Sequence, residues 1–437
     1  MLFRSTNAKI VKAVGVVFLV ILLSRILLPS ISPAFFDSPE YLRLFENANF
    51  FDSLRQVHNP IHPLFLLVFW LFNKVPLGTT LLRAEFLNGI LGFLTMVVIY
   101  KISRSLIVTV FIAFLPYFWL SQVNLLYEPL LIFLLGLSVY YLKNIRLAAL
   151  FFALAFLVST TALIYLLPLL AWIWIKQPRQ LLPAVFVFGV YLLGGSLVYG
   201  LITSPAGLFL NANSPLNKMM IEGWLFFPRV VRNMVVIYFN YLTIPLGLVC
   251  LWLGLRKKNL VLLLAWLVAF FLANSIWHAG MFGRLSLGLT ILPVFLISQI
   301  KNRFFLAGLF LLLLVQSIKL VVPYHFQEIP YWQEKKAVAN LAGDPLLIIS
   351  NYEEPYLQGK FNYLVLNSPQ TDEIKIRAAI VEAKNHQRTV LITPQVVTTP
   401  YFQYDGLSFH LLSQGQNHPE TLGQKLMAEF DLETLMF

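Results

Sequence analysis

The sequence is poor in charge and almost without cysteine. Charged residues make up 12% of its 437 residues and hydrophobic residues 58%, and the mean hydropathy is +0.75, which excludes an ordinary soluble globular protein. The single cysteine, Cys250, excludes an intramolecular disulfide framework. The sequence has no Walker loop, no G-x-G-x-x-G, H-E-x-x-H or G-x-S-x-G motif and no internal repeat, so the chemistry that these motifs carry is not indicated.

Positive charge is unevenly distributed. Residues 1–323 hold 24 Lys and Arg against 7 Asp and Glu, whereas residues 324–437 hold 8 against 13. The cations of the first part lie in short turns between apolar runs, where they orient a membrane protein rather than bind nucleic acid. We therefore expect no nucleic-acid partner, and we predict a membrane domain at residues 1–323 and a soluble domain at residues 324–437.

Apolar runs long enough to cross a bilayer, which takes roughly 20 residues, recur through the first domain. The run 10–29 follows Arg4, Lys9 and Lys12, contains Arg25 and is not followed by an A-x-A site. We interpret it as an uncleaved anchor with its N-terminus in the cytosol. The other clear runs are 83–100, 105–121, 127–142, 181–202, 235–255, 260–277, 285–300 and 304–322.

Two further segments allow more than one interpretation. Residues 147–175, interrupted by Ser159-Thr160-Thr161, form either one tilted helix or two short helices that meet at a polar tip. Residues 63–75 are short for a span and are a candidate re-entrant or juxtamembrane helix. If 147–175 is a hairpin and 63–75 does not cross, the cations of five loops all face the cytosol. They are Lys101, Arg104, Lys143, Arg146, Lys176, Arg179, Arg256, Lys257, Lys258, Lys301 and Arg303.

This topology predicts a polytopic α-helical protein of the cell (inner) membrane with about 11 spans and a cytosolic N-terminus. The residues after 322 are then extracytoplasmic. Among them, strand-like runs at 345–350, 363–366 and 389–393 and an amphipathic stretch at 371–386 predict a small α/β domain.

The same topology places all seven acids of the first domain on the outer side. Outer loops that merely avoid Lys and Arg would also collect acids at random, and this explains Glu46, Asp52 and Glu222 as well as function does. It is a weaker explanation for Asp37, Glu40 and Glu128. The full set is Asp37, Glu40, Glu46, Asp52, Glu85, Glu128 and Glu222.

The first outer loop, residues 30–62, carries the candidate chemistry. Asp37 follows two phenylalanines and precedes Ser38-Pro39, and Glu40 comes next. A carboxylate beside apolar surface is partly desolvated, which makes Asp37 a candidate general base. Alternatively, Asp37 or Ser38 caps a helix that begins near Pro39, which explains the spacing equally well.

Two histidines of this loop, His58 and His62, lie four residues apart. They could join a carboxylate in a metal site, but Pro60 and Pro63 argue against a regular helix. Histidines at the membrane interface in a Pro-rich turn explain the pattern better. Whether the protein needs a divalent metal stays open, and no cofactor is indicated with certainty.

Glu128 begins another apolar run, after Tyr127 and before Pro129. An acid at this position is either part of a site or a first-turn charge that compensates the helix dipole. The two interpretations stay open.

The candidate cations of the outer side lie in two segments. His278 and Arg284 flank an outer turn, and Arg229 and Arg232 end the outer loop 203–234. Each Arg could bind a lipid phosphate in bidentate fashion or pair with an outer acid. Binding to anionic lipid headgroups is the favoured interpretation for Arg229 and Arg232, and a functional role is favoured for Arg284.

Short motifs, taken in their order along residues 10 to 320, resemble those of GT-C glycosyltransferases. Most similar is the branch of polyprenyl-phosphate-sugar transferases related to protein O-mannosyltransferases and the lipid A aminoarabinose transferase. The motifs that carry the resemblance are Asp37-Ser38-Pro39-Glu40-Tyr41-Leu42, His62-Pro63-Leu64, Pro116-Tyr117-Phe118-Trp119-Leu120-Ser121 ahead of Tyr127-Glu128-Pro129, and Gly283-Arg284 with Pro293 in the next helix.

The resemblance implies an integral-membrane glycosyltransferase with a GT-C-like fold. Such an enzyme moves a sugar, with inversion, from a polyprenyl-phosphate donor to a hydroxyl of a glycan, lipid or protein acceptor on the outer face. Asp37 would take the proton of that hydroxyl, Glu128 would orient acceptor or sugar, and Arg284 would neutralise the departing phosphate. The first-loop helix and the segment 63–75 would shape a groove for the lipid tail among membrane lipids.

The sequence departs from this family in two places. Ser159-Thr160-Thr161 stands where many relatives have an Arg-Pro or a Lys, and Ser38-Pro39 separates Asp37 from Glu40, which are adjacent in several relatives. Two other classes therefore stay open. One is a secondary transporter or lipid flippase, for which ionisable residues in mid-span are typical. The other is a non-catalytic lipid-binding assembly protein in which Asp37 is only a helix cap.

Overall fold

The computed structural model divides the chain into two compact units. Unit 1 comprises Met1–Pro29, Leu44–Val322 and Pro419–Phe437, and unit 2 comprises Ser30–Arg43 and Pro323–His418. The structure describes residues 2–33, 38–56, 62–202, 219–220, 223–275, 287–328, 332, 336, 346–350, 362–366, 378, 381–383, 385–388, 390–392 and 410–411.

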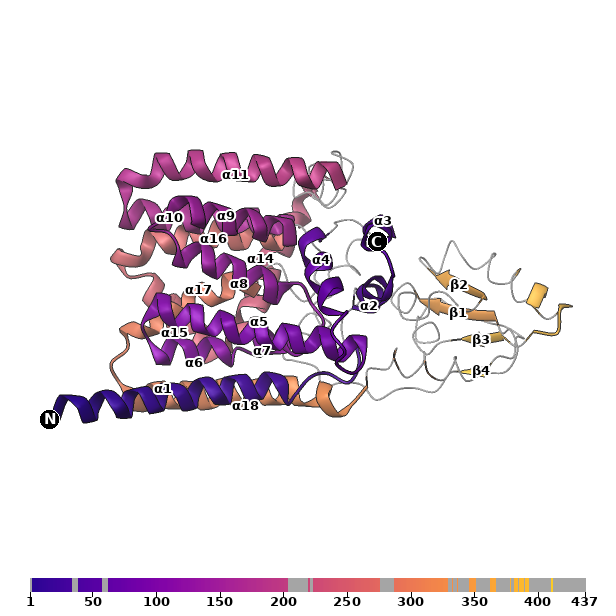
Figure 1. The fold of residues 1–437 in the computed structure, drawn as a ribbon, viewed down its shortest axis with the longest axis horizontal. Helices are drawn as coiled ribbons and strands as arrows, with labels where there is room; N and C mark the ends of the chain where they lie inside the picture. Colours follow the sequence, from indigo (N-terminus) through magenta and orange to yellow (C-terminus); the bar gives the residue numbers. More distant parts are fainter. Residues whose placement is uncertain are drawn as a thin grey trace. The chain divides into compact units, whose positions relative to one another are not determined.

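Helices make up unit 1 almost entirely (Figure 1). The α-helices are α1 (Leu2–Ile26), α2 (Ser38–Glu46), α3 (Phe50–Gln56), α4 (Pro63–Phe72), α5 (Thr80–Ser103), α6 (Leu106–Ala113), α7 (Pro116–Gln122), α8 (Glu128–Tyr140), α9 (Ile145–Val158), α10 (Leu166–Lys176), α11 (Leu181–Ile202), α14 (Phe226–Leu242), α15 (Ile244–Gly254), α16 (Leu260–Ser275), α17 (Leu287–Val294) and α18 (Arg303–Phe326). Short 3-10 helices are η1 (Thr160–Tyr165), η2 (Pro178–Gln180), η3 (Gly223–Leu225), η4 (Lys257–Asn259) and η7 (Phe295–Gln299). Of these, α2 begins in unit 2 and α18 ends in it.

Several helices are long and apolar enough to cross a membrane. Within the described part of the chain three meet this condition alone, Thr80–Ser103, Pro178–Gly200 and Arg303–Phe326. The pair Gly223–Leu242 and Ile244–Gly254, bent by 110°, adds a fourth if it forms one span. The structure also has shorter apolar helices of 10–17 residues. The chain is therefore a helical, membrane-associated protein, as predicted, while the number of spans stays a prediction.

The ambiguous run 147–175 consists of two helices. Helix α9 ends before Ser159, whose extended backbone (φ −158°, ψ 133°) interrupts the helix and whose hydroxyl lies 2.8 Å from the Thr161 hydroxyl. The start of α9, with Lys143 and Arg146, lines the same hollow as Gln180 just before α11. Because α10 leads directly to that end, it runs in the opposite direction to α9, and it packs against α16 and α11. The hairpin that the positive-inside rule favoured is therefore present.

Two predicted single runs are broken in the structure. The run 105–121 divides into α6 and α7 because Pro116 has no N–H to donate and Leu115 before it is extended (ψ 131°). The run 235–255 bends at Thr243, which has φ 69° and ψ 150°, a conformation that a β-branched residue rarely adopts. Breaks of this kind cannot be read from hydropathy, which is uniform across them.

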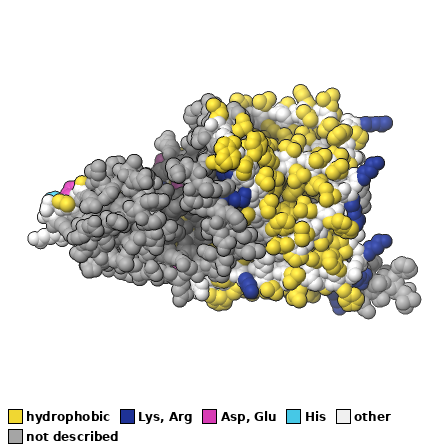
Figure 2. All heavy atoms as spheres, turned by 180° about the vertical axis from the view of Figure 1, so that it is seen from behind, with side chains coloured by type: hydrophobic (Ala, Val, Ile, Leu, Met, Phe, Trp, Pro, Cys, Tyr) yellow, Lys and Arg dark blue, Asp and Glu magenta, His cyan; other side chains and the backbone are white. Residues whose placement is uncertain are grey.

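Cationic loops gather at one end of the helices. Lys101 at the end of α5 lies 5.7 Å from the ring of Tyr140 at the end of α8, and Lys143 and Arg146 share a hollow with the residues before α11. Figure 2 shows Lys and Arg side chains along the edge of an apolar surface. This segregation is the pattern that the positive-inside rule describes.

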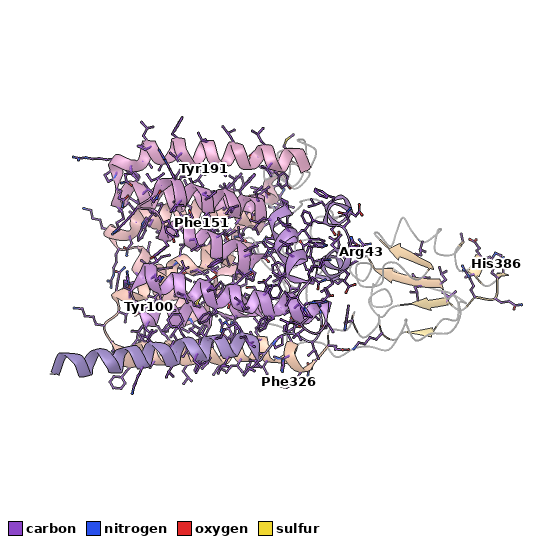
Figure 3. The ribbon with its side chains drawn as sticks, in the orientation of Figure 1. Arg43, Tyr100, Phe151, Tyr191, Phe326 and His386 are labelled. Atoms are coloured by element: carbon purple, nitrogen blue, oxygen red, sulfur yellow. The ribbon has the colours of Figure 1, made fainter. Side chains whose placement is uncertain are left out.

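Aromatic side chains join neighbouring helices of unit 1. Tyr100 of α5 meets Phe18 of α1 edge to face, with ring centroids 5.7 Å apart, and Phe151 of α9 stacks on Tyr141 at 5.4 Å (Figure 3). Such pairs add stability beyond the area they bury.

A buried cation holds α1 against α5 and α7. Arg25 is 1% exposed, and its guanidinium donates to the side-chain oxygen of Gln122 (2.8 Å), to the Ser24 hydroxyl (2.6 Å) and to the carbonyl of Ala113. Glycines of α5 make room for this cluster. A Cβ atom at Gly92 would lie 2.4 Å from the Gln122 side chain.

Unit 2 contains a sheet of four parallel strands in the order β2-β1-β3-β4. Strands β1 (Leu346–Ser350), β2 (Asn362–Leu366) and β3 (Val390–Ile392) lie in the three predicted strand-like runs. The two-residue strand β4 (His410–Leu411) was not predicted, because it is too short to show the alternation of apolar and polar residues that indicates a strand. Residues 381–383 are helical, within the predicted amphipathic stretch.

Gly92→Ala is expected to destabilise the protein. The added Cβ would overlap the Gln122 side chain, so we predict a loss of about 1–3 kcal/mol, typical of overpacking. The matched control is Gly308→Ala in α18, where a Cβ meets nothing within 4 Å and where alanine favours the helix. Thermal unfolding in detergent measures both, and equal midpoints for the two variants would contradict the packing described here.

Candidate functional site

The structure describes some of the predicted site residues and not others. Asp37, His58, His278 and Arg284 lie outside the described residues. Of the remainder, Glu40 belongs to unit 2, whereas the rest belong to unit 1. The unit 1 residues are His62, Tyr127, Glu128, Arg229 and Arg232.

In unit 2, Glu40 lies in the first turn of α2 and is partly exposed. That helix begins at Ser38, so the predicted helix start near Pro39 is confirmed. The main-chain N–H of Ile31 donates to the carbonyl of Tyr324 (3.1 Å), which ties the segment after α1 to the end of α18 within this unit. The predicted base Asp37 directly precedes α2 in the sequence.

His62 and Tyr127 form a stacked pair in unit 1. Their ring centroids are 4.1 Å apart with an interplanar angle of 24°. His62 precedes Pro63 at the start of α4, is 3% exposed and places its Nδ1 atom 2.7 Å from the carbonyl of Val158. Because a carbonyl only accepts, that nitrogen carries a proton. The pair thereby joins the starts of α4 and α8 to the end of α9.

Glu128 lies next to this pair and is buried. It begins α8 and is 1% exposed. The hydroxyl of Tyr165, at the end of η1, lies within electrostatic range of both Glu128 and Tyr127 and accepts a hydrogen bond from the N–H of Gly288 (3.1 Å). Tyr165 was not singled out from the sequence, because an aromatic residue in an apolar run carries no distinguishing signal.

An apolar cavity of about 230 Å³ begins at Tyr165 and Gly288. Helices α5, α8, α10, α15, α16 and α17 line it. Its walls include Ile99, Leu135, Trp172, Cys250, Trp266 and Leu292. A chamber with such walls suits a hydrocarbon chain rather than a polar ligand. Glu128 begins α8 one turn before Ile132, the first residue of that helix to line the cavity, so the buried acid lies near one end of the apolar chamber.

Arg229 is buried on α14. It is 4% exposed, donates to the carbonyl of Ser275 at the end of α16 (3.3 Å) and lies 5.5 Å from the ring of Phe226. Arg232 is partly buried and donates to the Asn233 side chain (3.3 Å). Arg229 therefore fixes the point from which the chain continues into residues 276–286, the segment that contains His278 and Arg284.

No metal cluster accompanies these residues in the part of the chain that the structure describes. There, no group of three or more His, Cys, Asp and Glu side chains could hold a metal ion. The described part of the site in unit 1 consists of one acid, Glu128, with aromatic rings, two arginines and main-chain groups.

No protein-family model, no curated protein and no solved structure matches this chain. Its class therefore rests on its own fold and site. They define a helical membrane protein with a buried carboxylic acid at one end of an apolar cavity.

His62→Phe is expected to destabilise unit 1. Phenylalanine keeps the stacking on Tyr127 but leaves the buried carbonyl of Val158 without its donor, which costs about 1–3 kcal/mol. The control is His386→Phe at an exposed position, which should change the thermal midpoint little. A His62→Phe protein as stable as the wild type would show that the hydrogen bond contributes nothing.

Proposed function

We propose that the protein is an integral-membrane glycosyltransferase of the GT-C type. It moves a sugar from a polyprenyl-phosphate donor to an acceptor hydroxyl on the extracytoplasmic face, with inversion at the anomeric carbon. The observation that carries the proposal is the buried Glu128, with Tyr127, His62 and Tyr165, at one end of the apolar cavity. A lipid-linked sugar needs this combination of a polar head site and an apolar chamber.

The two ends of the donor match two kinds of surface in unit 1. Its isoprenoid tail is pure hydrocarbon, which the apolar walls of the cavity can surround without leaving a polar group unpaired. Its sugar carries hydroxyl groups, and a carboxylate such as that of Glu128 accepts strong hydrogen bonds from them. In this proposal the donor lies with its tail toward the cavity and its head toward Glu128.

The reaction needs a base and a cation, and the sequence resemblance assigns them. Asp37 takes the proton from the acceptor hydroxyl, whose oxygen attacks the anomeric carbon. The bond from that carbon to the phosphate oxygen breaks, and polyprenyl phosphate leaves. Arg284 neutralises its negative charge. Support from the fold is indirect: Arg229 holds Ser275, two residues before Trp277 in the segment that leads to Arg284.

The proposal includes the topology of about 11 spans with a cytosolic N-terminus. The hairpin at Ser159 and the cationic end of unit 1 support it. In this topology the C-terminal α/β domain is extracytoplasmic. The membrane is the cell (inner) membrane.

One observation favours a second candidate function, a secondary transporter or lipid flippase. Arg25 and Glu85 are ionisable residues buried within apolar helices, and such residues often mark ion pathways. The non-catalytic assembly protein has no comparable observation in its favour.

Mass spectrometry of the lipids that co-purify in mild detergent tests the proposal. We expect a polyprenyl phospho-sugar with the wild type and more of it with Asp37→Asn, which binds the donor but lacks the base. Glu128→Gln should carry less donor and should lower transfer by about 100-fold or more. Glu46→Gln, at an exposed position, is the matched control. Bulk phospholipid alone in all four preparations, with no sugar-bearing lipid, would contradict the proposal.

A further inference from the structure

Glu85 is an acid for which the proposed transfer reaction has no use. It lies in the second turn of α5, a helix long and apolar enough to cross a membrane, and is 1% exposed. Among the residues that the structure describes, neither of its carboxylate oxygens has a hydrogen-bond partner. A charged carboxylate without a partner is strongly unfavourable in an apolar interior, so Glu85 must bind either a proton or a metal cation.

Two asparagines near Glu85 present further oxygen atoms. Asn88 donates its amide group to the carbonyls of Asn124 (2.7 Å) and Leu126 (2.9 Å), and Asn124 donates its own amide to the carbonyl of Leu120 (3.0 Å). These bonds fix which side of each amide is nitrogen. The atoms left without a partner in the described structure are therefore oxygens, Oδ1 of Asn88 and Oδ1 of Asn124.

The chain between α7 and α8 brings these groups together. Gln122, the last residue of α7, lies against Gly92, and Asn88, one turn earlier on α5, holds residues 124 and 126. The non-helical residues 123–127 thus run along α5 toward Glu85, which is three residues before Asn88 on the same face. All of them are buried. Unwound backbone at membrane depth is tolerated where it lines a site, and such segments coordinate sodium in transporters.

We propose that Glu85, Asn88 and Asn124 bind a sodium ion between α5 and residues 123–127. All three available groups are oxygen acceptors, which hard cations prefer. A single carboxylate balances a single positive charge, so a monovalent ion fits better than a divalent one.

Arg25 is not the counter-ion of Glu85. Its backbone lies against Gly89, on the same face of α5, but its guanidinium donates to Gln122, Ser24 and Ala113 instead. This leaves the carboxylate available to an ion. The site is independent of the proposed transfer reaction, which uses none of its three ligands.

Sodium-dependent stability of the full-length protein tests the site. The purified protein in detergent is melted in sodium chloride, potassium chloride or choline chloride at equal ionic strength. Because an ion that binds only the folded state stabilises it, we expect sodium to raise the wild-type midpoint by roughly 3 °C or more at saturation. Glu85→Gln should lose this rise, whereas Glu46→Gln, an exposed glutamate, should keep it.

A second variant and a direct measurement keep the test decisive if Glu85→Gln does not fold. Asn124→Ala should weaken sodium binding at least 10-fold, and binding of radioactive sodium to the wild type should saturate at one ion per chain. Equal midpoints in all three salts, without saturable sodium binding, would overturn the proposal. A thermal midpoint that does not change with sodium and rises only on acidification would also overturn it, because Glu85 would then hold a proton. Neither result bears on the transferase proposal.

Discussion

The buried guanidinium of Arg25 is the contact on which the centre of unit 1 depends. A charge in an apolar helix must find its partners inside the protein, and Arg25 donates to Ala113 at the end of α6 and to Gln122 at the end of α7. This fixes where α7 ends. Residues 123–127 then follow α5, where Asn88 holds them. This places Tyr127 and Glu128 at the start of α8. The position of the candidate site is thus set by one cation in the first helix.

The polar groups around Glu128 lie between packed helices on one side and the apolar cavity on the other. His62 and Tyr127 join α4, α8 and α9, while Tyr165 lines the apolar cavity and accepts a hydrogen bond from Gly288. A ligand with a polar head and a hydrocarbon tail meets both surroundings at once. The sodium site proposed at Glu85 uses Asn124 of the same non-helical segment, but none of its ligands takes part in the proposed transfer.

Hydropathy and turn residues predicted much of the fold. The apolar runs, the hairpin at Ser159, the helix start at Ser38 and three strands follow from local patterns. The bend at Thr243 does not, because its positive φ is imposed by packing rather than by a glycine. Among site residues, a polar pair such as Tyr127-Glu128 is visible in an apolar sequence. The main-chain partners of His62, Arg25 and Tyr165 are not, because Val158, Ala113 and Gly288 contribute only main-chain groups, which every residue has.

The most direct test of the account is a cryo-electron microscopy structure of Asp37→Asn with its co-purified lipid. Our account predicts a hydrocarbon chain in the cavity that ends at Tyr165 and Gly288, with a phospho-sugar head next to Glu128. A lipid bound elsewhere on the protein, with the cavity closed and no ligand beside Glu128, would contradict it.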